Sequence, residues 1–424
     1  MDYGLIGAKL GHSFSAEIHA RIADYRYELC ELTVEGVHEL MQTRPFRAIN
    51  VTIPYKETVI PLIDEISPHA ARIGAVNTIV NRGGRLCGFN TDYAGAAALI
   101  RHAGVNVTGK KVLILGTGGT AKTMHAVVED MSPAQILTVS RRPSPDTNTI
   151  TYEQASAEHT DAQIIINTTP VGMFPNTDAS PIDLDKFPAA EGVIDVIYHP
   201  LSTCLVEAAR KRNIPAEGGL YMLAAQAVYA SALFLGTAQD ENVPYDSLAP
   251  LIERAYRGVL EQKQNIVLIG MPSSGKSTVG VRLAALTGRR LLDTDEITAN
   301  LAGMPIPEIF RTQGETAFRA TEARAVKQAA DESGVIIATG GGAPLFPQNM
   351  DKLRQNGVIF LLDRSLEKLI ATADRPLTSN REALAQKYRD RMPLYRALCD
   401  FSIPGDGSVE QVAREILDRF ETWS

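Results

Sequence analysis

The feature that most constrains the fold is a glycine-rich turn directly after a short apolar run. Asn265–Ile269 has the composition of a buried strand, and Gly270–Ser277 follows it with the full pattern G-x-x-x-x-G-K-[ST]. In a phosphate loop of this kind, backbone N–H groups at the start of a helix surround the phosphates of a nucleotide. The sequence therefore predicts a P-loop parallel-sheet domain of the α/β class over residues 264–424.

The phosphate loop also predicts the roles of its side chains. Lys276 should reach the β and γ phosphates and Ser277 should help to hold Mg²⁺, so ATP and Mg²⁺ are the expected ligands. Asp293 and Asp295 follow an apolar pair, and strand alternation predicts both carboxylates on one side of an extended segment, near Mg²⁺ and an acceptor hydroxyl. GTPases, motor ATPases and small-molecule kinases share this loop, so the loop alone leaves the acceptor open. The expected nucleotide contacts are Gly270, Ser273, Ser274, Gly275, Lys276, Ser277 and Thr278.

A second glycine-rich turn indicates a dinucleotide site in the first half of the chain. The apolar run Lys111–Leu115 leads into Gly116–Ala121, which fits the form G-x-G-x-x-A, although a simple tight turn is the alternative. After the next predicted strand, Ser140-Arg141-Arg142 stands where an NAD site usually has an acidic residue. Guanidinium groups suit a 2′-phosphate, so NADP(H) is favoured over NAD. The expected cofactor contacts are Gly116, Gly118, Gly119, Thr120, Ala121, Ser140, Arg141 and Arg142.

The length of 424 residues exceeds what one hydrophobic core normally serves, so several domains are expected. We predict three α/β lobes. They are a substrate-binding lobe over residues 1–100, completed by helices from about 235–260, a Rossmann lobe over residues 101–234, and the P-loop domain over residues 264–424. Leu248–Leu260 has helical apolar spacing, and the polar run Glu261–Gln264 is interpreted as a linker.

Charge, cysteine content and the N-terminus restrict the class of protein. The formal net charge of −7 argues against a broad surface for nucleic acid or anionic membrane. Four scattered cysteines without a CxxC pair fit a reduced compartment. No signal-peptide pattern opens the chain, and no apolar stretch approaches the roughly 20 residues of a membrane span. A cytoplasmic protein without nucleic-acid or membrane partners is expected, and its oligomeric state stays open.

Lys56 and Asp92 are candidates for handling the proton that accompanies hydride transfer. Lys56 follows a predicted strand, and Asp92 lies in a polar loop before an Ala-rich segment. Taken alone, either residue is more often a surface side chain or a helix cap.

Several segments, in order over about residues 1–260, resemble the shikimate dehydrogenase family. The matching segments are Gly11–Ser15, Asn50–Lys56, Gly74–Thr78, Asn90–Asp92, Asn167–Met173, Asp195–Pro200 and Gly219–Gln226. The resemblance implies that Lys56 and Asp92 are the catalytic pair. It implies further substrate contacts from Ser13, Ser15, Thr52, Asn77, Tyr198 and Gln226. Ala8–Gly11 and Tyr93 depart from the family pattern, which affects the substrate loop and the helix entry.

The last part of the chain resembles the shikimate kinase family over about residues 264–420. Arg319 and Glu322 are three apart on a predicted helix, and a run of three glycines follows a buried-looking strand. An ordinary ion pair and a simple turn are the alternatives. The resemblance implies that Asp293 lies on the Mg²⁺ side and that Asp295 contacts the acceptor hydroxyl. It also implies shikimate contacts from Arg319, Gly340, Gly341, Gly342 and Arg391, and a phosphate contact from Arg375 at the start of a lid that continues over residues 378–390.

Together the two resemblances imply a bifunctional enzyme. One part would reduce 3-dehydroshikimate to shikimate with NADPH, and the other would phosphorylate shikimate to shikimate 3-phosphate with MgATP. One alternative is a quinate/shikimate-type dehydrogenase fused to another small-molecule kinase. The other is a regulatory binding protein without catalysis, which we would expect to have lost one of the four implied catalytic residues. All four are present: Lys56, Asp92, Lys276 and Asp295.

Overall fold

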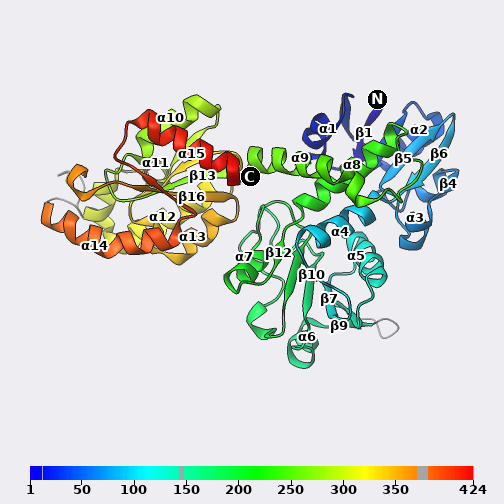
Figure 1. Cartoon of the computed structure of the whole chain (residues 1–424), viewed down its shortest axis with the longest axis horizontal. Helices are drawn as coiled ribbons and strands as arrows, with labels where there is room; N and C mark the ends of the chain where they lie inside the picture. The colour runs from blue at the N-terminus through cyan, green and yellow to red at the C-terminus, as the bar shows by residue number, and fades with distance from the viewer. Residues whose placement is uncertain (12, 143–147, 370–380, 424) are drawn as a thin grey trace. The chain divides into compact units, whose positions relative to one another are not determined.

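The structure is a computed structural model that describes residues 1–11, 13–142, 148–369 and 381–423. The chain divides into two compact units, Met1–Val259 and Leu260–Ser424. Figure 1 shows the helices and strands of each unit. Helices alternate with strands throughout, and most strand pairs are parallel, so the predicted α/β class is confirmed.

The first unit opens with a mixed sheet of order β2-β1-β3-β5-β6-β4. Strand β5 is antiparallel to both β3 and β6, and the remaining pairs are parallel. Apolar side chains such as Ile6, Ile49 and Ile79 are fully buried beneath helix α2. The strands are β1 (Tyr3–Gly7), β2 (Tyr27–Glu31), β3 (Ala48–Val51), β4 (Glu65–Ile66), β5 (Thr78–Arg82) and β6 (Arg85–Phe89), and the helices are α1 (Ser15–Ile22), α2 (Val34–Thr43) and α3 (Pro68–Ile73).

The second sheet of this unit is parallel throughout, with the order β12-β11-β10-β7-β8-β9. This is the doubly wound order, in which the chain changes direction between β7 and β10 and ligands bind at the carboxyl ends of the strands. The strands are β7 (Lys111–Leu115), β8 (Gln135–Val139), β9 (Thr149–Ile150), β10 (Ile164–Asn167), β11 (Gly192–Asp195) and β12 (Ala216–Glu217), and the helices are α5 (Gly119–Asp130), α6 (Tyr152–Glu158) and α7 (Cys204–Lys211).

Helices α4 (Thr91–His102) and α8 (Leu220–Phe234) pack against each other between the two sheets of the first unit (Figure 1). Helix α8 is apolar on all sides, and nearly all of its residues are buried, as this pattern requires. It also contacts α1, β3 and β5. Asp92 of α4 and Gln226 of α8 are among the residues predicted to contact the substrate, so this buried pair positions both of them.

The second unit is a five-stranded parallel sheet of order β14-β15-β13-β16-β17. Helices cover both faces of this sheet. Along β13, Ile266 and Leu268 pack in one hydrophobic core with α10 and α15, whereas Val267 and Ile269 pack in a second core with α12 and α13. The strands are β13 (Asn265–Ile269), β14 (Leu291–Asp293), β15 (Ile336–Ala338), β16 (Gly357–Asp363) and β17 (Phe401–Pro404), and the helices are α10 (Lys276–Thr287), α11 (Thr294–Ala302), α12 (Ile306–Ala330), α13 (Pro347–Arg354), α14 (Arg381–Leu398) and α15 (Val409–Trp423).

The interpretation of Glu261–Gln264 as a linker is wrong. Helix α9 runs over Tyr245–Lys263, so only Gln264 separates it from β13. Arg289 holds the last turn of α9, since its guanidinium donates to the carbonyl oxygens of Glu261 and Gln264, each at 2.5 Å. The polar run is therefore the solvated end of an anchored helix.

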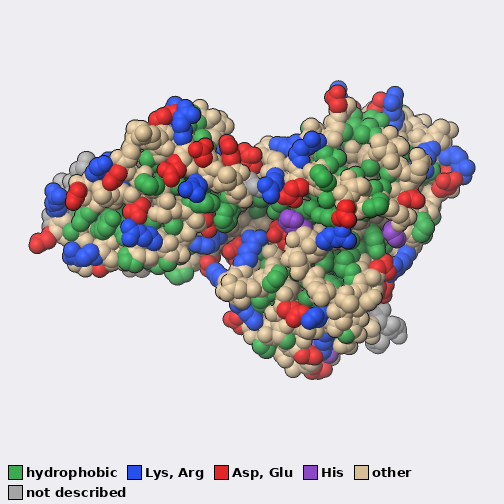
Figure 2. All heavy atoms as spheres, in the orientation of Figure 1, with side chains coloured by type: hydrophobic (Ala, Val, Ile, Leu, Met, Phe, Trp, Pro, Cys, Tyr) green, Lys and Arg blue, Asp and Glu red, His purple; other side chains and the backbone are tan. Residues whose placement is uncertain are grey.

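The surface carries charges of both signs. On the face drawn in Figure 2, Lys and Arg side chains are intermixed with Asp and Glu on both units. Within the described parts of the chain, none of the helices combines the length and the apolar character that crossing a membrane requires.

Candidate active sites

The first unit contains a cavity of about 590 Å³ that both of its sheets line. Residues after β1 and β3 meet there with the start of α4, the loops after β10 and β11, and helix α8. Every dehydrogenase residue predicted to act on the substrate lines this cavity: Ser13, Ser15, Thr52, Lys56, Asn77, Asp92, Tyr198 and Gln226. Segments up to about 200 residues apart in sequence are thus brought to one site.

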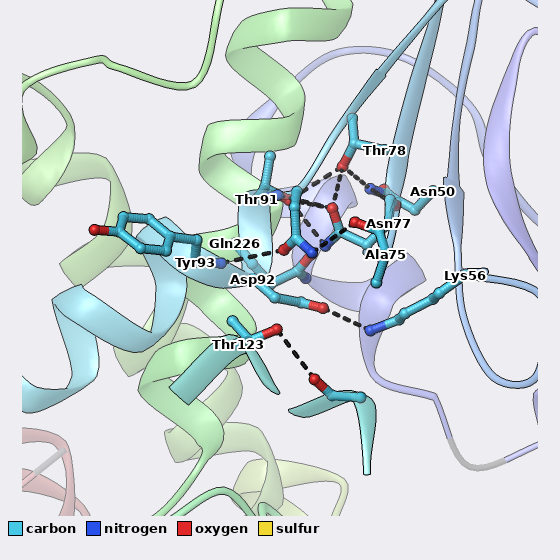
Figure 3. Close-up of polar contacts among 12 residues, drawn as sticks. Asn50, Lys56, Ala75, Asn77, Thr78, Thr91, Asp92, Tyr93, Thr123 and Gln226 are labelled. Carbon is cyan, nitrogen blue, oxygen red and sulfur yellow. Dashed lines mark hydrogen bonds and ion pairs between the residues drawn. The ribbon is translucent and has the colours of Figure 1, made fainter. Parts of the chain in front are cut away.

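Lys56 and Asp92 form an ion pair at the cavity wall (Figure 3). Lys56 Nζ lies 2.5 Å from Asp92 Oδ2, and the side chains are 24% and 16% exposed. Asp92 lies in the first turn of α4, where the positive end of the helix dipole favours a carboxylate, and Asn90 caps this turn by accepting from Tyr93 N at 3.3 Å. The pair thus holds a cation at the cavity with its position fixed by a helix terminus.

A buried hydrogen-bond network fixes Asn77 behind this pair (Figure 3). Asn77 Oδ1 accepts from Thr91 N at 2.8 Å, and Asn77 Nδ2 donates to Thr91 Oγ1 at 3.1 Å. Asn50 Nδ2 donates to Thr78 Oγ1 at 3.0 Å and to the backbone oxygen of Asn77 at 3.2 Å. Asn50 Oδ1 in turn accepts from Tyr27 at 2.8 Å. Because the buried side-chain amides of Asn50 and Asn77 have these hydrogen-bond partners, the Asn77 side chain has one defined orientation at the cavity.

The remaining polar wall comes from loops with internal support. Ser13 Oγ donates to Ser15 Oγ at 3.0 Å, and Gln226 Nε2 donates to Leu223 O at 2.9 Å. Tyr198 is largely buried, which raises the pKa of its phenol, so it stays a neutral hydroxyl. The loop that carries it is held by the fully buried Asp195, which accepts from Ile197 N at 3.0 Å and whose pKa burial raises to about 6.

The predicted dinucleotide turn, Gly116–Ala121, reaches the same cavity at Thr120. Gly116 has φ 109°, and a Cβ there would lie 2.8 Å from Thr168 Oγ1, so only glycine fits between β7 and the segment after β10. Gly118 is the N-cap of α5, and a Cβ on Gly118 or Gly119 would meet no atom within 4 Å. Thr120, one residue further, lines the cavity. The open helix N-terminus beside the polar wall fits the pyrophosphate of a dinucleotide.

The other predicted cofactor contacts lie nearby in the fold. Ala121 is buried in the first turn of α5, where it supports the turn rather than facing open space. Ser140, Arg141 and Arg142 follow the end of β8, and Ser140 Oγ accepts from Arg142 N at 3.2 Å. Both arginines are exposed. They lie at the carboxyl end of β8, the strand that follows the glycine-rich turn and α5 in the chain. In folds of this kind, residues at this position contact the 2′-phosphate of NADP.

The phosphate loop of the second unit has the backbone that its pattern predicts. Gly270, Ser273 and Gly275 all have positive φ, of 149°, 64° and 97°, and Gly275 caps α10. Lys276 Nζ donates to the carbonyl oxygens of Gly270 and Met271, each at 3.0 Å, which folds this side chain over the loop. Ser274 Oγ is buried without a hydrogen-bond partner among the described residues. A concave row of N–H groups with a lysine and an unsatisfied hydroxyl fits a nucleotide phosphate.

The predicted Mg²⁺ ligands meet at the start of α10. Ser277 Oγ donates to Asp293 Oδ2 at 2.6 Å, and Thr278 is exposed on the same helical turn. The predicted reason for the position of Asp293 and Asp295 is wrong, because β14 ends at Asp293 and α11 begins at Thr294. Asp293 is instead the N-cap of α11 and accepts from Asp295 N at 2.9 Å. Helix capping, not strand alternation, sets the relative positions of the two carboxylates.

The three glycines after β15 pack directly on the predicted acceptor-site side chains. A Cβ on Gly340 would overlap Asp295 Oδ1, and a Cβ on Gly342 would overlap the Arg319 guanidinium. Thr294 Oγ1 accepts from Gly340 N at 2.8 Å. Arg391 Nη1 donates to the carbonyl oxygen of Gly341 at 3.2 Å. The residues implied to bind shikimate therefore lie close together, with the backbone of the three glycines packed against the side chains of Asp295, Arg319 and Arg391.

Arg319 is oriented by acidic partners. Its Nη1 donates to Glu322 Oε2 at 2.8 Å, and its Nη2 to Glu315 Oε1 at 3.1 Å. Glu322 is 1% exposed, and this burial raises the pKa of its carboxyl against the opposing effect of Arg319. The (i, i+3) geometry on α12 is as predicted. Arg375 and residues 378–380 lie outside the described residues, and residues 381–390 of the expected lid belong to helix α14.

Several residues that shape the sites were not assigned from the sequence. In the first unit these are Asn50, Thr78, Thr91 and Tyr27, which hold Asn77, and in the second unit Thr294, which holds Gly340. A signal exists for Asn50 and Thr78, because each is a polar residue in an apolar strand segment. Buried polar groups of this kind need partners.

Comparisons with known proteins match a family model to a part of each unit. Residues 5–79 match the family model of the shikimate dehydrogenase substrate binding domain. The shikimate dehydrogenase (NADP(+)) of Clostridium perfringens (strain SM101 / Type A) is 34% identical over 256 residues, which cover 57% of this chain and 94% of that enzyme. The chain belongs to the shikimate dehydrogenase family.

Solved shikimate dehydrogenases share the fold of this part. A chorismate mutase/shikimate 5-dehydrogenase fusion protein from Clostridium acetobutylicum has a TM-score of 0.55 and 32% identity, covering 61% of this chain and 97% of that one. Shikimate 5-dehydrogenase from Thermus thermophilus, solved with NADP(H) and shikimate, has a TM-score of 0.53 and 28% identity, covering 61% and 99%.

The rest of the chain is a kinase. Residues 272–421 match the shikimate kinase family model. The predicted combination is therefore confirmed: a shikimate dehydrogenase is joined to a shikimate kinase domain, which makes the chain a bifunctional enzyme of the shikimate pathway.

Proposed function

We propose that the first unit reduces 3-dehydroshikimate to shikimate with NADPH, and that the second unit phosphorylates shikimate with MgATP to give shikimate 3-phosphate. The observation that carries the first half is the position of the Lys56–Asp92 pair. It lies in the cavity that Thr120 of the dinucleotide turn also lines. The NADP(+) dependence of the Clostridium perfringens relative and the exposed Arg141 and Arg142 support NADP(H) as the cofactor.

In the dehydrogenase, NADPH supplies a hydride to the ketone carbon when bound. The carbonyl oxygen gains negative charge as the hydride arrives, and Lys56 offsets this charge and delivers a proton to that oxygen. Asp92 holds Lys56 Nζ at 2.5 Å beside the cavity. Asn77, fixed by Thr91, and the hydroxyls of Ser13, Ser15, Thr52 and Tyr198 recognise the polar groups of the substrate.

In the kinase, MgATP supplies the γ-phosphoryl group when bound. Asp295 orients the acceptor hydroxyl of shikimate, and Arg319 and Arg391 bind its carboxylate. Lys276 leaves the loop carbonyls to which it donates and offsets phosphate charge, while Ser277 and Asp293 hold Mg²⁺. The product of the first reaction is thus the acceptor of the second.

One assay tests both halves. The full chain is given 3-dehydroshikimate, NADPH and MgATP, and NADPH oxidation and ADP release are followed separately. We expect Lys56→Ala to stop NADPH oxidation while the protein still phosphorylates added shikimate, and Lys276→Ala to do the reverse. Lys186→Gln, a charge change on an exposed lysine outside both sites, is the control. Loss of both reactions in a folded single variant would contradict two independent sites.

A further inference from the structure

Lys9 brings a positive charge to the dehydrogenase cavity that the mechanism above does not use. It lies on the loop after β1, at the carboxyl end of an interior strand of the first sheet. The acidic and basic side chains among the described residues that line the cavity are Lys9, Lys56 and Asp92, beside the imidazole of His199. Lys56 and Asp92 neutralise each other, so Lys9 leaves the cavity with an excess of positive charge.

The backbone around Lys9 is held in place. Ala8 N donates to Ile53 O at 3.4 Å, and Leu10 N donates to Glu31 Oε1 at 2.7 Å. The Leu10 side chain is 4% exposed, so the residue after Lys9 is anchored in the core. Lys9 itself is exposed, and no ion pair joins it to any other residue in the described part of the chain. The ammonium group is therefore available to a ligand, on a side chain whose backbone is anchored beside the cavity.

The same loop carries the two serines of the cavity wall. Ser13 N donates to Leu10 O at 3.0 Å, which turns the chain so that Ser13 and Ser15 line the cavity together with Lys9. A cation flanked by hydroxyl donors is suited to a carboxylate.

We propose that Lys9 pairs with the carboxylate of the substrate and is a specificity-determining residue of the dehydrogenase. This inference rests on the proposed function of the cavity. The carboxylate keeps its charge throughout the reduction, so Lys9 stabilises the bound substrate and the transition state equally. Such uniform binding lowers KM and leaves kcat unchanged.

The test compares wild type, Lys9→Gln and Lys9→Arg as full chains, with NADP⁺-dependent oxidation of shikimate measured without ATP. We expect Lys9→Gln to raise KM for shikimate about fivefold, as loss of one solvent-accessible ion pair would, with kcat and KM for NADP⁺ unchanged. Lys9→Arg should restore most of the affinity. Added salt should raise KM more in wild type than in Lys9→Gln, because screening acts on the ion pair. Lys186→Gln is again the matched control.

An uncharged substrate separates binding of the carboxylate from a structural role. With shikimate methyl ester, wild type and Lys9→Gln should have the same kcat/KM. Three results for Lys9→Gln would each overturn the proposal: an equal loss of kcat/KM with the acid and the ester, an unchanged KM for shikimate, or a raised KM for NADP⁺ instead. The last result would assign Lys9 to a phosphate of the cofactor. Wild-type activity on shikimate is the separate test of the proposed function, since its absence would reject that function whatever Lys9 does.

Discussion

Replacing Gly342 by alanine should weaken shikimate binding in the kinase without straining the backbone. Gly342 has φ −97° and ψ −17°, which alanine adopts freely. Its added methyl group, however, would overlap Arg319 Nη1 and lie 3.0 Å from Arg319 Cζ. The methyl group and the guanidinium cannot both keep their positions, so the guanidinium must move.

The size of the effect follows from how tightly Arg319 is held. Its side chain is 14% exposed and that of Glu322 is 2% exposed, and the guanidinium packs over the rings of Phe318 and Phe346 at 5.0 and 5.3 Å. Displacement costs charge-assisted hydrogen bonds that contribute about 1.5–3 kcal/mol each. If one such bond to the shikimate carboxylate is lost, kcat/KM for shikimate falls about 10- to 150-fold.

The assay is ADP release with shikimate varied and NADP⁺ absent. Gly407→Ala is the matched control in the same unit. Its one tight contact would be with the flexible end of the Gln411 side chain, at 3.2 Å, and its other two contacts, at 3.7 and 3.9 Å, are ordinary van der Waals distances. Trp423, the single tryptophan, reports the folding of the second unit, and NADP⁺-dependent oxidation of shikimate reports the first. A Gly342→Ala protein with wild-type kcat/KM, or with equal loss of both activities, would refute the steric argument.

Two further predictions concern pH and Mg²⁺. Burial lowers the pKa of His19 to about 3, so the folded first unit binds fewer protons than the unfolded chain between that pH and 6.5, and its stability should fall as pH falls through this window. Between pH 6.5 and 5, the free energy of unfolding of wild type should fall by about 2 kcal/mol relative to that of His19→Gln, whose side chain cannot be protonated. Hydrogen exchange of peptides that cover α1 measures this difference. Parallel pH profiles of the two proteins would contradict the prediction. Asp293→Asn keeps an acceptor for Asp295 N and thus the cap of α11, but it should raise the Mg²⁺ concentration for half-maximal kinase activity about tenfold, and an unchanged requirement would remove Asp293 from the Mg²⁺ site.

The nucleotide turns were predictable because their chemistry is local. A strand, a glycine-rich turn and a helix start within one short segment, and the positive φ values at Gly116, Gly270 and Gly275 follow from the residues themselves. The same holds for the Arg319–Glu322 pair, since helical spacing alone brings residues three apart together. The α/β class followed from repeating such units.

Other features depend on which strands become neighbours, and the sequence did not supply them. The contact from Tyr27 to Asn50 and on to Thr78 joins β2, β3 and β5, and its first step spans β1, which lies between β2 and β3 in the assembled sheet. The error at Asp293 and Asp295 has a local cause, because the same residues can either continue a strand or cap a helix. Asp293-Thr294-Asp295 was predicted as an extended segment, yet the strand ends two residues earlier, at Asp293, which caps helix α11.

The two units recognise the same acid, shikimate, through different groups, and this difference follows from the residues that line each predicted site. In the kinase, three glycines bring the backbone against Asp295 and Arg319, so recognition relies on a few charged groups in a tight space. In the dehydrogenase, the cavity wall combines apolar residues with short polar side chains, of which Asn77 is oriented by a buried network, and the acidic and basic side chains among its described lining residues are the Lys56–Asp92 pair and Lys9. We propose that recognition of shikimate depends on the close packing at positions 340–342 in the kinase, and in the dehydrogenase on side chains that a buried hydrogen-bond network orients. Substitutions that alter recognition in one unit therefore act on contacts that the other unit does not contain, although both sites bind the same molecule.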